Sequence, residues 1–138
     1  MSRPEDYRNR IISISYGIGG FFQGHSEDTI RKKTDCAIVE GRESSPFGPG
    51  FEPLEISLEV WYEMLDKLYR DVRIHEWKKR YVNPDILDGT QWSINIELSD
   101  GQTISYYGSN EYPPRWEEFG KVFREACSGR KMRPLLEP

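Results

Sequence analysis

Five polar side chains flank a predicted hairpin, and their types are the ones in this chain best suited to bind or convert a small molecule. They are Asp88, Thr90, Ser109, Asn110 and Tyr112. A carboxylate, hydroxyl groups and an amide can together line a pocket and orient a polar ligand by hydrogen bonds. The same short side chains also bond to nearby backbone groups and fix the path of the chain. We favour this structural role and keep ligand binding as the alternative.

Other arrangements that carry out catalysis are weak in this sequence. Asp85 and Asp88 form the only close pair of acids in a loop-like segment, and turn formation explains them better than glycoside chemistry. His25 and His75 stand alone, without the spacing of a metal site. No nucleophile motif GxSxG or phosphate-binding glycine loop is present. We therefore predict no catalytic residue, no metal and no cofactor, and we lean against an enzyme.

Two strands joined by a tight turn would hold the polar side chains in place. Apolar and polar residues alternate along 92–98 and again along 103–107, which is the pattern of strands with one buried face. Asp100 and Gly101, which lie between them, are a strong signal for a hairpin. The sequence therefore predicts an antiparallel pair whose open end carries both polar clusters.

The register of this hairpin follows from which side chains must stay together. A two-residue turn would set Ile96 opposite Ser105, whereas a three-residue loop at 99–101 keeps the apolar residues on one face. The longer loop also places Gly101 where a bulged turn needs a left-handed residue. We predict this loop, with three pairs of residues opposite one another: Ile96 with Ile104, Ile94 with Tyr106, and Trp92 with Gly108.

The same stretch resembles a family of small bacterial domains of unknown function. In that family an Asp-Gly-Thr-x-Trp strand start is followed by Gly-Ser-Asn-x-Tyr-Pro before a helix, and the likeness covers about residues 81–125. The matching residues are Asp88, Gly89, Thr90, Trp92, Gly108, Ser109, Asn110, Tyr112 and Pro113. The resemblance implies a bacterial cytosolic origin and brings no activity, cofactor or catalytic residue with it.

The rest of the chain predicts further strands and two helices. Alternation predicts a strand along 11–18, a second apolar series of one parity runs along 29–40, and the residues at 41–53 are rich in Gly and Pro and form a loop. Apolar residues at three- and four-residue steps predict helices at 58–72, capped by Ser57, and at 116–127. Residues 73–81 then either continue or kink the first helix.

These elements predict one α+β domain over 1–138, with 1–9 and 130–138 as loose tails. Their order is hairpin, helix, hairpin, helix. The architecture this order implies is an antiparallel sheet of four or more strands with both helices packed on one face.

Composition narrows the range of partners. Nineteen Lys and Arg against 23 Asp and Glu give a net charge of −4, which disfavours nucleic acid and membrane surfaces as partners. Cys36 and Cys127 are far apart and lack a companion ligand, so we expect two buried thiols and neither a disulfide nor zinc. The charged start of the chain and the interrupted apolar run at 11–18 are typical of neither a signal peptide nor a membrane span, so we expect a cytoplasmic protein.

The function that fits these observations best is binding without chemistry. Catalytic spacing is weak, the chain is acidic, and 18 of its 138 residues are aromatic. We therefore predict a protein-binding module, within which an immunity or inhibitor protein for a basic enzyme is the specialised hypothesis. The alternative is a small-ligand protein or enzyme with its site at Asp88, Thr90, Ser109 and Asn110.

Overall fold

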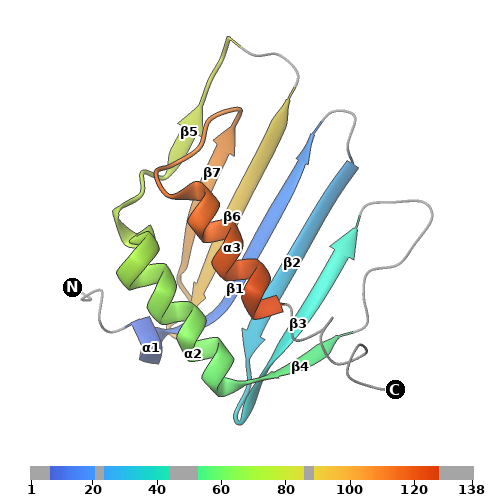
Figure 1. Ribbon diagram of the computed structural model, residues 1–138, viewed down its shortest axis with the longest axis vertical. Coiled ribbons are helices and arrows are strands. Elements are labelled where there is room, and N and C mark those ends of the chain that lie inside the picture. Colours follow the sequence, from blue (N-terminus) through green and yellow to red (C-terminus); the bar gives the residue numbers. More distant parts are fainter. Residues whose placement is uncertain (1–6, 21–23, 44–52, 86–88, 128–138) are drawn as a thin grey trace.

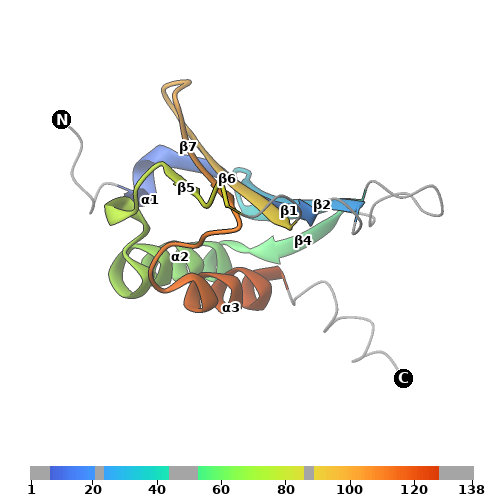
Figure 2. The same ribbon diagram turned by 90° about the horizontal axis from the view of Figure 1, so that it is seen from above.

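The fold is a seven-stranded sheet with helices against one face (Figures 1 and 2). The computed structural model describes residues 7–20, 24–43, 53–85 and 89–127. Its strands are β1 (Ile11–Gly20), β2 (Gly24–Lys32), β3 (Cys36–Glu43), β4 (Leu54–Ser57), β5 (Arg80–Val82), β6 (Thr90–Leu98) and β7 (Thr103–Ser109). Its α-helices are α1 (Tyr7–Arg10), α2 (Leu58–Asp66) and α3 (Trp116–Cys127).

The sheet is almost entirely antiparallel. Its strand order is β4-β3-β2-β1-β6-β7-β5, and only the β5–β7 pair is parallel. The α+β class and the antiparallel sheet of at least four strands are therefore confirmed.

The structure does not follow the predicted order of hairpin, helix, hairpin, helix. Four strands precede α2, because the series at 29–40 divides into β2 and β3 and because β4, which was not predicted, forms just before the helix. At the turn between them the Lys33 N–H donates to the Cys36 carbonyl at 2.7 Å. Ile30 pairs with Val39, so Ile38 faces the opposite side of the sheet. The prediction gave the apolar residues before and after this turn a single parity. That part is wrong, because the turn places Ile30 and Ile38 on opposite faces of the sheet.

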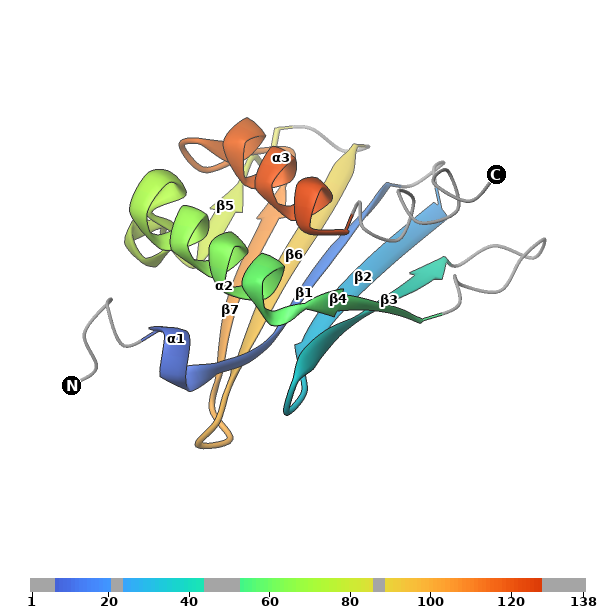
Figure 3. The ribbon, with the colours of Figure 1, turned by 60° about the horizontal axis from the view of Figure 1, so that its bottom comes forward.

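Alternation along each strand places the core between the sheet and the helices. Figures 2 and 3 show α2 and α3 lying over the same face. Along β6 every second residue from Trp92 to Leu98 is buried, and the residues between them are only partly so. The largest fully buried side chains of the described residues come from both layers and include Ile14, Ile30, Trp61, Leu65, Leu68, Trp92, Ile94, Ile96, Phe119 and Phe123.

The predicted register of the β6–β7 hairpin is confirmed. Ile96 pairs with Ile104, and the remaining two pairs follow as expected. The Gly101 N–H donates to the Leu98 carbonyl at 3.0 Å, and the Leu98 N–H donates to the Gln102 carbonyl at 2.8 Å. Gly101 has a φ of 92°, so the bulged three-residue loop needs the left-handed residue that the sequence supplies.

Both long helices form where the spacing of apolar residues predicts them. Ser57 caps α2 by accepting a hydrogen bond from the Val60 N–H at 3.2 Å. The helix continues as a wider π-helical turn over Lys67–Val72 and ends at Arg73, whose φ of 59° is left-handed. A 3-10 turn at Ile74–Glu76 and then β5 follow, so residues 73–81 do not continue the helix. The three residues of β5 are too few to show an alternating pattern.

Helix α1 begins inside the segment that was expected to be a tail. Tyr7 is buried, and its ring stacks on Tyr69 with 4.6 Å between the centroids. Its hydroxyl donates to Asp66 at 2.5 Å, and the Arg8 Nε donates to the same carboxylate at 2.9 Å. These contacts fasten α1 to α2. Residues 1–6 and 128–138 lie outside the described part, as does most of the predicted loop at 41–53.

The junction of α1 and α2 predicts a pH-dependent stability. The hydrogen bond from Arg8, with help from Tyr7, lowers the pKa of Asp66 below its ordinary value of 3.8. The carboxylate therefore stabilises the folded state above pH 3.8, and this contribution is lost as the pH falls through the lower folded pKa. Urea unfolding of Asp66→Asn against the natural protein should show a deficit at pH 6 that shrinks below pH 3.8. Asp71→Asn, which removes an exposed carboxylate nearby, is the control.

Candidate functional site

The polar corner lies where β6 begins and β7 ends. Gln91 pairs with Ser109, so the register brings Thr90 beside Asn110. The Asn110 N–H donates to the Thr90 carbonyl at 2.9 Å, and the Thr90 N–H donates to the Asn110 side-chain Oδ1 at 2.9 Å. Asp88 lies outside the described residues. The structure thus brings together Thr90, Ser109 and Asn110, three of the five candidate residues, through backbone and side-chain hydrogen bonds.

Asn110 has two structural tasks at this corner. Its φ of 61° is left-handed, a conformation that Asn tolerates better than most residues with a side chain. Its amide oxygen caps the Thr90 N–H, and its amide Nδ2 lies 3.5 Å from the Ser109 Oγ. An amide engaged in this way fixes the exit of the chain from β7.

Two glycines allow the corner to close. A Cβ at Gly89 would lie 1.8 Å from the Asn110 Oδ1, and a Cβ at Gly108 would lie 2.0 Å from the Trp92 Nε1. Both distances are far inside van der Waals contact, so any other residue would displace its neighbour. The Trp92 Nε1 also donates to the Glu111 carbonyl at 2.9 Å, which ties the indole to the chain beyond the corner.

Aromatic rings fill the space behind the corner. Trp116 of α3 lies 4.5 Å from Trp92 and 6.2 Å from Trp77, measured between ring centroids. Tyr112 is exposed and its ring lies 5.3 Å from Trp116. Tyr112 therefore lies at the exposed edge of a packed aromatic cluster.

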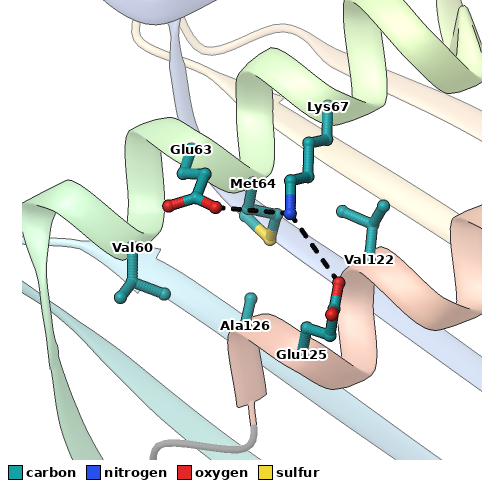
Figure 4. Close-up of a pocket in the computed structure, with 7 residues that line it drawn as sticks. All are labelled: Val60, Glu63, Met64, Lys67, Val122, Glu125 and Ala126. Carbon is teal, nitrogen blue, oxygen red and sulfur yellow. Dashed lines mark ion pairs between the residues drawn. The ribbon is translucent and has the colours of Figure 1, made fainter.

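A shallow groove lies between α2 and α3 (Figure 4). Its volume is about 150 Å³, which is small beside the 300 to 1,000 Å³ of typical ligand sites. The Lys67 ammonium lies over it, 3.3 Å from Glu63 and 3.8 Å from Glu125 (Figure 4). The hydrogen bond with Glu63 raises the pKa of Lys67. Sequence reasoning missed this groove, because it arises from the packing of two helices.

No family model matches this chain, and no curated protein does.

The sheet face opposite the helices carries a second set of polar side chains. The Ser13 hydroxyl and the Arg31 guanidinium each donate to Glu97 at 3.0 Å. These two hydrogen bonds, that of Ser13 first, lower the pKa of Glu97. Two further pairs, Ser15 with Thr29 at 2.9 Å and Ser105 with Asn95 at 2.7 Å, lie on the same face. We call this surface the open face, since no described helix covers it (Figure 2).

Metal-binding clusters and membrane-spanning helices are both absent from the part of the chain that the structure describes. No three His, Cys, Asp or Glu side chains in that part of the chain group closely enough to bind a metal ion. Cys36 and Cys127 are both buried, as predicted. None of the described helices is long and apolar enough to span a bilayer.

The contact of Gly108 with Trp92 predicts a large effect of one methyl group. Gly108→Ala should lower the free energy of unfolding by about 3 kcal/mol, because the indole must move to admit the Cβ. Gly120→Ala is the matched control, since its Cβ meets only the flexible end of Arg124 at 3.0 Å. This change should leave stability unchanged or raise it by up to about 1 kcal/mol, because Ala favours a helix interior. Equal losses in urea unfolding would contradict the packing argument.

Two substitutions of Asn110 separate its tasks. Asn110→Ala removes the cap on Thr90 and puts an unfavourable residue at a φ of 61°, so we expect a loss of about 2 kcal/mol. Asn110→Gly removes the cap but keeps the left-handed backbone, so the loss should be about half as large. Thermal unfolding monitored by circular dichroism measures both. If neither variant loses stability, the corner is not structural.

Proposed function

We propose that this protein is a non-catalytic module that binds another protein, and that it acts in the bacterial cytoplasm. The observation that carries the proposal is that the described helices cover only one face of a seven-stranded sheet. Strands lie about 4.8 Å apart and rise about 3.3 Å per residue, so the seven strands together give an open face of about 800 Å². This surface matches the area that each partner contributes to a standard protein interface.

The chemistry of the open face also supports a protein partner. Its central side chains are short, and several are already held by hydrogen bonds to one another, as in the Ser13, Arg31 and Glu97 group. Such a surface loses little side-chain entropy when a partner covers it.

The alternative hypothesis is a small-ligand or enzymatic site at Asp88, Thr90, Ser109 and Asn110. It has less support, because the amide oxygen of Asn110 is engaged with the backbone of Thr90. The described groove between α2 and α3 is small and is spanned by the ion pairs of Lys67.

We also propose that the chain belongs to the family with the DGTxW and GSNxYP motifs. The contacts of Gly89 with Asn110 and of Gly108 with Trp92 give a physical reason for those residue types at those positions. The motif would then mark a way of closing a hairpin onto a helix, and it carries no chemistry in itself.

A bulky charge on the open face tests the proposed function. Ser93 lies on β6, opposite Gly17 of β1 and Tyr107 of β7. Capture from a bacterial lysate at near-physiological salt should return a partner with the natural protein and lose it with Ser93→Arg. Glu118→Arg, on the exposed side of α3, is the control and should keep the partner. No partner with any of the three proteins, or equal capture by all, would count against the proposal.

A further inference from the structure

Strand β5 forms one end of the sheet, and no described strand pairs with its outer side (Figure 1). It is joined to β7 in parallel, with Arg80 opposite Tyr107 and Val82 opposite Ser109. The edge of a sheet presents unpaired backbone groups to whatever approaches it. If the protein binds other proteins, as proposed above, this edge is a place where a partner can pair with its backbone.

The backbone geometry identifies the groups that face outward. The Tyr107 N–H donates to the Lys79 carbonyl, and the Asn83 N–H donates to the Ser109 carbonyl, both at 2.9 Å. In a parallel ladder alternate residues of a strand bond to the same neighbour. Since Lys79 and Asn83 face β7, the N–H and C=O groups of Arg80 and Val82 point away from it. Together they offer two donors and two acceptors over three residues.

The side chains at this edge are basic and partly apolar. Arg80 lies 5.8 Å from the ring centroid of Tyr107, and Lys79 lies 4.7 Å from that of Tyr106. Val82 and Tyr107 are each 37% exposed, and they are two of the three exposed large hydrophobic residues among those described. Lys79 and Arg80 form no ion pair with a described acid. Although the whole chain has a net charge of −4, this edge is basic.

We propose that β5 accepts an extended, acidic segment of a partner protein as an eighth strand of the sheet. Arg80 and Val82 are two residues apart and share the open face, so the added strand would set an acidic residue near Arg80 and, two residues along, an apolar residue near Val82. The backbone groups of Arg80 and Val82 supply affinity that does not depend on sequence. The two basic residues select for acidic segments.

The same charges argue against two other occupants. Pairing two copies of β5 about a twofold axis would bring Arg80 and Lys79 close to their own copies, and like charges across a strand pair are destabilising. Single-stranded nucleic acid binds along basic grooves with aromatic platforms, whereas this basic region covers one short strand of an acidic chain. Basic side chains on an edge also prevent unselective pairing with neutral strands.

A short synthetic peptide tests the proposal on the full chain. The probe is the hexapeptide Thr-Glu-Thr-Val-Thr-Thr, in which the glutamate and the valine lie two residues apart and so share one face. It is titrated while the backbone amide signals of the protein are followed by NMR. We expect saturable shifts centred on Arg80 and Val82. The same peptide with lysine in place of the glutamate should bind at least about tenfold more weakly. N-methylation of the alternate amides that face β5 should abolish binding of the acidic peptide, whereas methylation of the other amides should not.

Two variants separate the backbone from the charge. Val82→Pro removes the outward N–H but no bond to β7, so the acidic peptide should bind about tenfold more weakly, whereas Val82→Thr should bind it normally. Arg80→Glu should reverse the preference, so that the lysine peptide binds more tightly than the glutamate peptide. Unchanged far-ultraviolet circular dichroism checks that each variant is folded.

Several outcomes would overturn the proposal. Peptide-induced shifts elsewhere in the sheet, equal binding of both peptides, or no binding at millimolar peptide would each do so. Tight binding of an oligothymidylate in place of the peptide would assign the edge to nucleic acid, and concentration-dependent broadening with loss of the Arg80 signal would assign it to a second copy. If Ser93→Arg still blocks capture of a partner when the peptide fails, the open face binds proteins and only the role of β5 is wrong.

Discussion

Trp92 is the residue through which the two layers of this fold depend on each other. It lies on β6, its indole covers Gly108 of β7, and its ring is 4.5 Å from Trp116 at the start of α3. Its Nε1 donates to the Glu111 carbonyl, which fixes the segment that leads from the sheet to that helix. Because the Trp92 indole fits only against a residue without a side chain, the contact with Gly108 fixes the register of β6 and β7 and the direction in which the chain leaves β7. The position of α3, and with it the closure of the core, follows from this contact.

The local parts of the fold were predictable from the sequence because their causes are local. The 99–101 loop followed from keeping Ile96 opposite Ile104, and both long helices followed from apolar spacing. The strand order did not follow, because nothing in the alternation of β1 says that it pairs with β6. The turn before Cys36 reversed the faces of β3, and β5 was too short to produce a pattern.

The sequence predicted which chain segments lie side by side at the candidate site. It did not predict what their side chains bind. Register alone placed Thr90 beside Asn110. Whether the Asn110 amide binds a ligand or a backbone N–H depends on how its side chain is oriented, and the alternation of apolar and polar residues does not determine that orientation. The open face could not be predicted from the sequence for a different reason. Its small polar residues have the pattern expected of any strand face exposed to solvent. The width of that surface follows only from the placement of both helices on the other face (Figure 2).

The central seam of the sheet has a consequence for how the chain reaches its native state. β1 bonds on one side to β2, which follows it directly, and on the other to β6, which comes after two helical segments and four other strands. The β1–β4 meander and the β6–β7 hairpin can each form from neighbouring residues, but the seam between them must wait for a distant segment. Closing such a long loop is the slow step in proteins dominated by non-local pairing. During synthesis β1 therefore remains an unprotected edge until β6 leaves the ribosome, and this interval is the one in which chaperones or misassembly would act.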